Sequence, residues 1–434
     1  MDRKINTVLI EWKNSAFRKP LIIRGARQVG KTYSVCELGK NQFDSFIKLD
    51  LERDRTAHKI FEGDLSAQKL ILELEVHTNQ RIVPGKTLLF LDEIQECERA
   101  VLSLRYFYEE FPDLHIIAAG SMLEFALENI SFPVGRVSFE WMRPMTFYEF
   151  LNASDKSILA EELPCFSDFR PITETIHLKI IEQLKTYLLV GGMPEAVKRY
   201  FLTGSVNQSF SVHEDLYQSY LQSLVKYNAK ADIDSMDHIL KSIPSHVGSQ
   251  IKYTRLDPER RIEKTKASLK IFERALLVHI IQSSNADGLP LNANASTKII
   301  KPLFLDIGLM QYNCGVSPSE ILRAKDLSNL YQGALAEQFV GQELLAHGGS
   351  ENFKLFYWSR AKKSSSAEID YLYTKTGKIY PIEVKSGPAG KLKSMHIFLD
   401  EHPHVEKGYV MSPVAFEKQK IEKLIFVPIY TRFI

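Results

Sequence analysis

A glycine-rich loop near the start of the chain constrains the fold more than any other feature of the sequence. Residues 25–32 fit the pattern GxxxxGK[ST], with Gly25 at the first position and Lys31 and Thr32 at the last two. The apolar run from Leu21 to Ile23 precedes this loop, and a helical pattern follows it. This order of strand, loop and helix distinguishes a phosphate-binding P-loop from a chance match to the pattern.

The P-loop predicts a site for ATP with Mg²⁺. Its glycines let backbone N–H groups face the phosphates at the amino end of a helix. Lys31 would neutralise the β and γ oxygens, and the Thr32 hydroxyl would bind Mg²⁺. The residues predicted to contact the nucleotide are Gly25, Ala26, Arg27, Gln28, Val29, Gly30, Lys31, Thr32 and Tyr33.

A second apolar run ends in two acids. Residues 88–91 read Leu-Leu-Phe-Leu and lead into Asp92 and Glu93. We expect Asp92 to hold the metal ion and Glu93 to orient and deprotonate the attacking water. Acids are also favoured at the amino end of any helix, so this pair alone would be ambiguous. The P-loop about 60 residues upstream favours the catalytic interpretation.

Polar and basic residues further on are additional candidates for an ATPase site. Ser121 follows the apolar run 116–119 and Gly120, where it could contact the γ-phosphate or serve as an ordinary turn residue. Arg136 and Arg143 lie in the next segment, and an added guanidinium stabilises the charge that develops in phosphoryl transfer. Most arginines in loops are only solvated, so both assignments stay open.

Together, these motifs resemble a family of predicted prokaryotic AAA-type ATPases that carry a C-terminal domain of unknown function. The resemblance rests on residues 24–32, 91–95, 119–121, 135–150, 191–195 and 304–309, so it covers nearly the whole chain. The resemblance firmly implies ATP binding. It says very little about the biological role. It leaves open whether the chain forms a homo-oligomer, in which an arginine could act on the site of a neighbouring subunit.

The pattern of apolar runs predicts an α/β protein. Through the first 150 residues, short apolar runs alternate with helical patterns, which is typical of a parallel sheet covered by helices on both faces. A capping box at Thr146 and Glu149 then opens a mainly helical region. We expect an AAA-type core over 1–150, a helical lid or connector over 151–205, a winged-helix-like domain over 206–330 and a restriction-endonuclease-like αβ domain over 331–434.

The middle of the chain contains a basic stretch. Between residues 250 and 275 there are eight Lys or Arg against four Asp or Glu. The segment reads as a short helix, a turn and a longer helix followed by a hairpin, which resembles the winged helices often joined to AAA modules. Such a helix would place Arg261, Lys264 and Lys266 near DNA phosphates. A solvated helix surface is the alternative, because Lys and Arg are good helix formers at exposed positions.

Near the C-terminus, residues 368–385 read as two strands joined by a turn at residues 376–377. A symmetric register places Asp370 opposite Glu383 and Glu368 opposite Lys385, all on one face. Two opposed carboxylates repel each other unless a cation such as Mg²⁺ lies between them. The apolar residues expected on the other face are Ile369, Tyr371, Ile382 and Val384.

This hairpin resembles the acidic and ExK core of restriction-endonuclease-like nucleases. The resemblance implies that Asp370, Glu383 and a helical acid, Glu337, hold a second metal ion, while Lys385 supports the charge at the reacting centre. The sequence departs from that pattern in having isoleucine rather than proline before Asp370. The alternative is a hairpin with a charged outer face and a weak ion pair between Glu368 and Lys385.

Composition adds little about partners, since 55 Lys and Arg balance 53 Asp and Glu. Widely spaced cysteines, the lack of a signal-peptide pattern and the lack of an apolar run of about 20 residues favour a cytoplasmic protein. We expect an ATPase whose nucleotide state is coupled to DNA binding or processing through a nuclease-like domain. The alternative is a nucleotide-controlled switch or a DNA-binding regulator whose C-terminal domain is a non-catalytic binding module.

Overall fold

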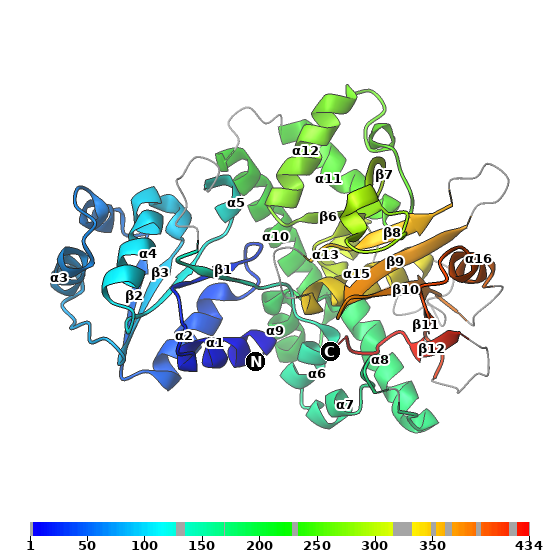
Figure 1. Ribbon diagram of the computed structural model, residues 1–434, viewed down its shortest axis with the longest axis horizontal. Helices are drawn as coiled ribbons and strands as arrows, with labels where there is room; N and C mark the ends of the chain where they lie inside the picture. Colours follow the sequence, from blue (N-terminus) through cyan, green and yellow to red (C-terminus); the bar gives the residue numbers. More distant parts are fainter. Residues whose placement is uncertain are drawn as a thin grey trace. The chain divides into compact units, whose positions relative to one another are not determined.

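The computed structural model describes residues 3–126, 135–168, 170–227, 233–315, 332–348, 353–360, 367–387, 392–415 and 423–433 (Figure 1). The chain divides into two compact units. The N-terminal unit covers residues 2–143, and the C-terminal unit covers residues 144–348 and 353–434.

A parallel sheet forms the centre of the N-terminal unit. Its described strands are β1 (Leu21–Arg24), β2 (Ser45–Asp50), β3 (Thr87–Asp92), β4 (His115–Ala119) and β5 (Ser138–Trp141), in the spatial order β2-β3-β4-β1-β5. Every described pairing between neighbours is parallel. Strands β1, β3 and β4 confirm the apolar runs predicted at residues 21–23, 88–91 and 116–119. The short, half-buried β5 was not predicted, because its four residues lack a continuous apolar run.

Helices cover both faces of this sheet, as predicted. They are α1 (Lys4–Asn14), α2 (Lys31–Gln42), α3 (Ala67–Thr78), α4 (Glu98–Glu110) and α5 (Leu123–Ala126), with short 3₁₀ turns η1 (Arg55–Phe61) and η2 (Ile94–Glu96). Leu89 and Leu91 of β3 share a buried cluster with side chains of α3 and α4. Phe90 points to the opposite face, because side chains alternate along a strand, and it stacks on Phe46 under Gly39 of α2.

The order of strands determines which loops meet. β4 lies between β1 and β3, and all three strands run in the same direction. The loops that follow β1, β3 and β4 therefore lie side by side at the carboxyl edge of the sheet, where ligands bind in open α/β sheets.

The first half of the C-terminal unit is helical. Its helices are α6 (Phe147–Ala153), α7 (Ser157–Glu161), α8 (Glu174–Val190), α9 (Pro194–Thr203), α10 (Val206–Tyr227), α11 (Ile233–Ser242), α12 (Ile262–Arg274) and α13 (Ile307–Asn313), with 3₁₀ turns η4 (Ile243–His246), η5 (Tyr253–Arg255) and η6 (Leu291–Asn294). The predicted capping box is present at the start of α6, where Thr146 and Glu149 cap each other's backbone.

A mixed sheet forms the second half of this unit. Its described strands are β6 (Val278–Ser283), β7 (Ser296–Phe304), β8 (Phe356–Ser359), β9 (Glu368–Lys375), β10 (Lys378–Val384), β11 (Gly408–Ser412) and β12 (Leu424–Pro428), in the order β12-β11-β10-β9-β8-β6-β7. The β6–β7 hairpin, expected as the wing of a separate domain, is continuous with this sheet because β6 pairs in parallel with β8. The predicted boundaries near residues 205 and 330 stay predictions.

The β9–β10 hairpin has the predicted register. Lys375 pairs with Lys378 around a turn in which residues 376 and 377 have φ of 47° and 74°. The side-chain prediction was wrong for Tyr371, which lies on the side of the carboxylates and donates a hydrogen bond to the Glu337 carbonyl oxygen at 2.7 Å. The pairing of β9 with β8 shifts register near this position, and such a bulge puts two successive side chains on one face.

Two helices pack on the mixed sheet (Figure 1). α15 (Gln332–His347) contacts β7, β9 and β10, while α16 (Lys393–Glu401) contacts β9. Ile369 and Leu372 of β9 share a buried cluster with Met395 and Phe398 of α16. Among the helices that the structure describes, none is long and apolar enough to cross a membrane.

Candidate nucleotide site and carboxylate cluster

The P-loop turns directly into helix α2. Gly30 occupies the N-cap position with φ of 99°, and Gln28 also has a positive φ of 61°. Gly25 lies so close to the Met142 carbonyl oxygen that a Cβ atom would collide with it. The loop therefore presents the first N–H groups of α2, which suits an anion such as a phosphate.

Lys31 is folded back onto this loop. Its Nζ donates to the carbonyl oxygens of Gly25 and Ala26 at 2.9 and 2.8 Å. Burial lowers the pKa of Lys31 to about 8, against the influence of Glu93 and Asp92, which raise it. The ammonium is thus held beside the loop by two neutral acceptors, and a phosphate oxygen would be a stronger partner.

Thr32 and Asp92 come together across the sheet edge. The Thr32 hydroxyl donates to both Asp92 carboxylate oxygens at 3.1 and 3.0 Å. The ammonium of Lys48 in β2 lies 2.8 Å from the same carboxylate. Burial raises the pKa of Asp92, while Lys48 and Thr32 lower it. A hydroxyl and a carboxylate at this spacing fit Mg²⁺, which prefers oxygen ligands.

Glu93 is held by two side chains at the same edge. Its Oε2 accepts hydrogen bonds from Gln95 Nε2 at 2.7 Å and from the Ser121 hydroxyl at 3.1 Å. Gly120 leaves the space that Gln95 fills, because a Cβ atom at residue 120 would collide with the Gln95 amide. The structure thus brings Ser121 to Glu93 and adds Gln95 and Lys48, for which sequence reasoning gave no role. The available signals were a polar residue two positions after Glu93 and a lysine within an apolar strand pattern.

Arg3 connects the P-loop to the end of β5. Its guanidinium is buried and donates to the Val29 carbonyl oxygen at 3.2 Å and to the Arg143 carbonyl oxygen at 2.8 Å. No signal in the sequence pointed to this role, because Arg3 precedes the motif by more than 20 residues in an unremarkable segment.

The two candidate arginines lie at different edges of the sheet. Arg136 precedes β5, whose first residue, Ser138, pairs with Leu21 at the amino end of β1. It lies on that edge, away from the P-loop of its own chain, and forms an ion pair with Glu109 at 3.1 Å. Arg143 follows the carboxyl end of β5, and burial lowers its pKa to about 10. Two further residues were predicted to contact the nucleotide. The Arg27 guanidinium lies 3.8 Å from the Glu52 carboxylate, and the Tyr33 side chain is exposed.

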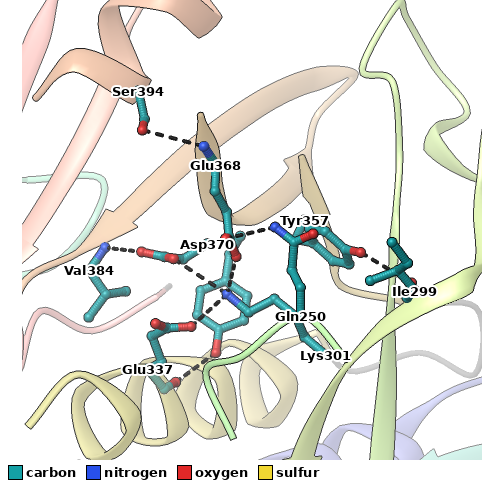
Figure 2. Close-up of polar contacts among 10 residues, drawn as sticks. Gln250, Ile299, Lys301, Glu337, Tyr357, Glu368, Asp370, Val384 and Ser394 are labelled. Atoms are coloured by element: carbon teal, nitrogen blue, oxygen red, sulfur yellow. Dashed lines mark hydrogen bonds and ion pairs between the residues drawn. The ribbon is translucent and has the colours of Figure 1, made fainter. Parts of the chain in front are cut away.

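A second group of charges lies in the C-terminal unit. Figure 2 shows Lys301 of β7 pointing toward Glu337 of α15 and toward Glu368 and Asp370 of β9. The Lys301 Nζ lies 2.7 Å from Glu337, 2.8 Å from Glu368 and 3.4 Å from Asp370. Burial alone would lower the pKa of Lys301, but the three carboxylates raise it well above its ordinary value. We call these four residues the Lys301 cluster.

Neighbouring groups hold the carboxylates of this cluster in place (Figure 2). Asp370 Oδ2 accepts from the Val384 backbone N–H at 2.7 Å, and Glu368 Oε2 accepts from the Gln250 side chain at 2.7 Å. Burial, followed by the Asp370 charge, raises the pKa of Glu337 to about 8.

The other two predicted nuclease residues pair with each other. The Lys385 Nζ lies 2.5 Å from Glu383 Oε1, so Lys385 pairs with Glu383 and not with Glu368, its partner in the alternative interpretation. The second oxygen of the buried Glu383 makes no hydrogen bond within the described part of the chain. No three His, Cys, Asp or Glu side chains among the described residues are arranged to hold a metal ion. Of the predicted metal ligands, Glu337 and Asp370 thus face Lys301 and Glu383 faces Lys385, so they do not fit a metal as they stand.

The basic stretch lies on and around α12. Its order of 3₁₀ turn, α12 and β6–β7 hairpin follows the predicted order of short helix, longer helix and hairpin. Thr265, Leu269 and Phe272 face the interior. The Lys266 ammonium lies 4.9 Å from the centre of the Tyr253 ring. The exposed basic side chains are Lys252, Arg255, Arg261, Lys264, Lys266 and Lys270.

Comparison with known protein families separates the chain into three segments. Residues 17–151 match the AAA domain family. Residues 181–320 match a domain of unknown function, DUF8612, and residues 332–431 match a domain of unknown function, DUF4143. No protein of curated function matches the chain.

The chain is also weakly similar to three solved structures. Orc1 of Aeropyrum pernix in complex with DNA has 12% identity and a TM-score of 0.28, covering 72% of this chain and 90% of that one. Drosophila ORC bound to DNA has 11% identity and a TM-score of 0.28, covering 72% and 85%. The Holliday junction branch migration motor RuvB of Thermotoga maritima has 12% identity and a TM-score of 0.29, covering 63% and 87%. Likeness at this level supports no conclusion about function.

The parallel sheet, the P-loop that opens α2 and the matched family define the N-terminal unit as a P-loop AAA-type ATPase domain. The chain as a whole joins this ATPase domain to segments that match two domains of unknown function. The resemblance read from the sequence is therefore confirmed for the ATPase class. The winged-helix-like and endonuclease-like assignments stay predictions.

Proposed function

We propose that this chain binds ATP with Mg²⁺ at its P-loop and hydrolyses it. The observation that carries the proposal is the meeting of three loops at one sheet edge, which brings Lys31, Thr32, Asp92, Glu93 and Ser121 together. These groups supply a phosphate-binding cation, two oxygen ligands for a metal ion and a carboxylate near the reacting centre.

Each residue has a role that follows from its contacts. Lys31 exchanges the Gly25 and Ala26 carbonyl oxygens for phosphate oxygens. Thr32 and Asp92 would hold Mg²⁺, which neutralises phosphate charge as it develops. Glu93 orients and deprotonates the attacking water, while Gln95 and Ser121 fix the direction of its carboxylate.

The test separates binding from turnover. Lys31→Ala should weaken ATP binding at least tenfold, because the phosphates lose their buried cation. Glu93→Gln should bind ATP with near wild-type affinity and lower turnover at least 100-fold, because an amide cannot accept the proton. Binding is measured with a fluorescent ATP analogue and turnover by phosphate release.

The matched control is Glu98→Gln, an exposed acid at the start of α4, which should leave both quantities unchanged. Wild-type hydrolysis by Glu93→Gln would show that another group is the base. Wild-type ATP affinity in Lys31→Ala would show that this loop is not the ATP-binding site.

We propose further that the nucleotide state controls contact with DNA through α12. Exposed basic side chains along and before this helix support the proposal, since Lys and Arg bind phosphates without sequence preference. The competing function is a nucleotide-controlled switch that binds a protein partner. Salt-dependent DNA affinity distinguishes the two, because only the first requires counterion release at α12.

A further inference from the structure

We propose that the Lys301 ammonium is the resident cation of the carboxylate cluster in the C-terminal unit, in the position where a nuclease would hold a divalent metal ion. The C-terminal unit then cleaves no nucleic acid by metal-activated water. This inference is independent of ATP hydrolysis, which belongs to the other unit.

The geometry matches an ammonium group. Lysine has three N–H donors and no acceptor, and Nζ of Lys301 faces three carboxylates at 2.7, 2.8 and 3.4 Å. These are hydrogen-bond distances, whereas oxygen ligands lie about 2.1 Å from Mg²⁺. Each donor therefore has an acceptor, and the carboxylate oxygens that a metal would need are directed to nitrogen.

The charges of the cluster are also compensated without a metal. Glu337 and Asp370 both pair with the Lys301 ammonium, and Glu368 is about one third exposed, where water solvates its charge. Glu383 has its own partner in Lys385. Each of these carboxylates thus already has an ammonium partner that Mg²⁺ would have to displace.

Lys301 is also held firmly. Its side chain is 2% exposed, and its strand, β7, packs against α15. Moving it out would leave the buried Asp370 carboxylate without its cation, and removing one partner of a buried ion pair is strongly destabilising. A metal ion would have to overcome this cost in addition to its own dehydration.

The first experiment titrates the full chain with Mn²⁺ in the absence of nucleotide. Wild type and Asp370→Asn should give the same isotherm by calorimetry, because any weak binding at the P-loop is common to both. A binding component present in wild type and lost in Asp370→Asn would overturn the proposal.

The second experiment removes the lysine. Lys301→Gln leaves the carboxylates without their cation, so Mn²⁺ should bind to this variant and raise its Tm by several degrees. Wild type should show no such shift. The Lys301→Gln/Asp370→Asn double variant should lose the gain, because it lacks a ligand.

Each of these results supports or contradicts the assignment of Lys301 as the cation of the cluster. A folded Lys301→Gln protein that takes up no Mn²⁺ would contradict the assignment of Lys301 to a metal position. If Lys301→Gln does not fold, the comparison of wild type with Asp370→Asn decides alone. Cleavage of plasmid or branched DNA by wild type with Mg²⁺ or Mn²⁺, lost in Glu383→Ala, would also overturn the proposal. ATP turnover of the same preparations is expected to persist throughout and would report separately on the ATPase.

Discussion

At the scale of single residues, Arg3 shows how a side chain outside the motif can shape the nucleotide site. One guanidinium group bridges the carbonyl oxygens of Val29 in the P-loop and Arg143 after β5. Both acceptors are backbone atoms, so the contact fixes the path of the chain rather than the chemistry of a side chain. Because phosphate binding depends on where the P-loop N–H groups point, Arg3 is a positioning residue for the ATP site.

Replacing Arg3 therefore tests the P-loop geometry. Arg3→Met keeps the aliphatic length and removes the donors, so ATP affinity should fall about tenfold, equivalent to about 1.4 kcal/mol. Equilibrium binding of an ATP analogue measures the effect. The control is Lys4→Met, the exposed neighbour that begins α1, which should bind ATP as wild type does. Unchanged affinity in Arg3→Met would show that the loop holds its shape without this bridge.

At the scale of elements, helix α15 carries buried acids toward two different partners. Glu337 meets Lys301, and Glu343 Oε1 accepts a hydrogen bond from the Phe147 backbone N–H at the start of α6 at 2.9 Å. Burial raises the pKa of Glu343 to about 8, and the nearby Glu149 adds to this, while the Phe147 N–H and Arg432 lower it. α15 is thus linked to a helix almost 200 residues earlier by one carboxyl group.

This pKa makes stability depend on pH. The folded pKa of Glu343 lies above its ordinary value of 4.5, so the folded protein retains a proton that the unfolded chain releases. The free energy of unfolding should therefore fall as pH rises from about 5 to about 9. Glu343→Gln keeps the acceptor without the charge, so it should flatten this dependence and be more stable than wild type at pH 9 by about 2–4 kcal/mol.

Urea denaturation of the full chain between pH 5 and pH 9 measures the effect, followed in the transition of the C-terminal unit. Glu182→Gln, an exposed acid on α8, should keep the wild-type pH dependence and serves as the control. Equal slopes for Glu343→Gln and wild type would show that Glu343 is ionised in the folded protein at neutral pH.

Local patterns explain which elements could be predicted. The P-loop, the strands leading to Asp92 and Ser121, and the β9–β10 register follow from runs of fewer than 20 residues. Within such a short run, the order of residues alone indicates which side chains come together. The partner of the predicted carboxylates could not be found in this way. Lys301 is 36 residues from Glu337 and 69 from Asp370, and a lysine within a strand pattern carries no sign of its acceptor.

At the scale of the whole molecule, the chain combines an ATPase unit with a second unit that exposes a basic surface. The proposed coupling requires that DNA affinity change with the nucleotide bound. Each phosphate contact to duplex DNA contributes about 0.9 to the slope of log K against log salt concentration. The slope therefore counts the contacts made in each nucleotide state.

The test replaces two exposed lysines of α12. Lys264→Ala/Lys266→Ala should weaken DNA binding and reduce the salt slope by about 2, measured by fluorescence anisotropy with and without ATP. The control is Lys179→Ala/Lys185→Ala, two exposed lysines of α8. Equal salt slopes for the two double variants would show that α12 does not contact DNA. The switch that binds a protein partner would then be favoured.

The parallel pairing of β6 with β8 also sets an order of events during synthesis. The described strands of the ATPase sheet are complete once Trp141 has been made, so that unit can fold while the ribosome is still translating the rest. β6 must wait, because Gln282 pairs with Phe356, more than 70 residues later. Until then the β6–β7 hairpin has an unpaired strand edge, and Lys301 lacks its carboxylate partners. The nascent chain therefore contains a folded ATPase unit and an incomplete sheet whose exposed edge we expect chaperones to bind.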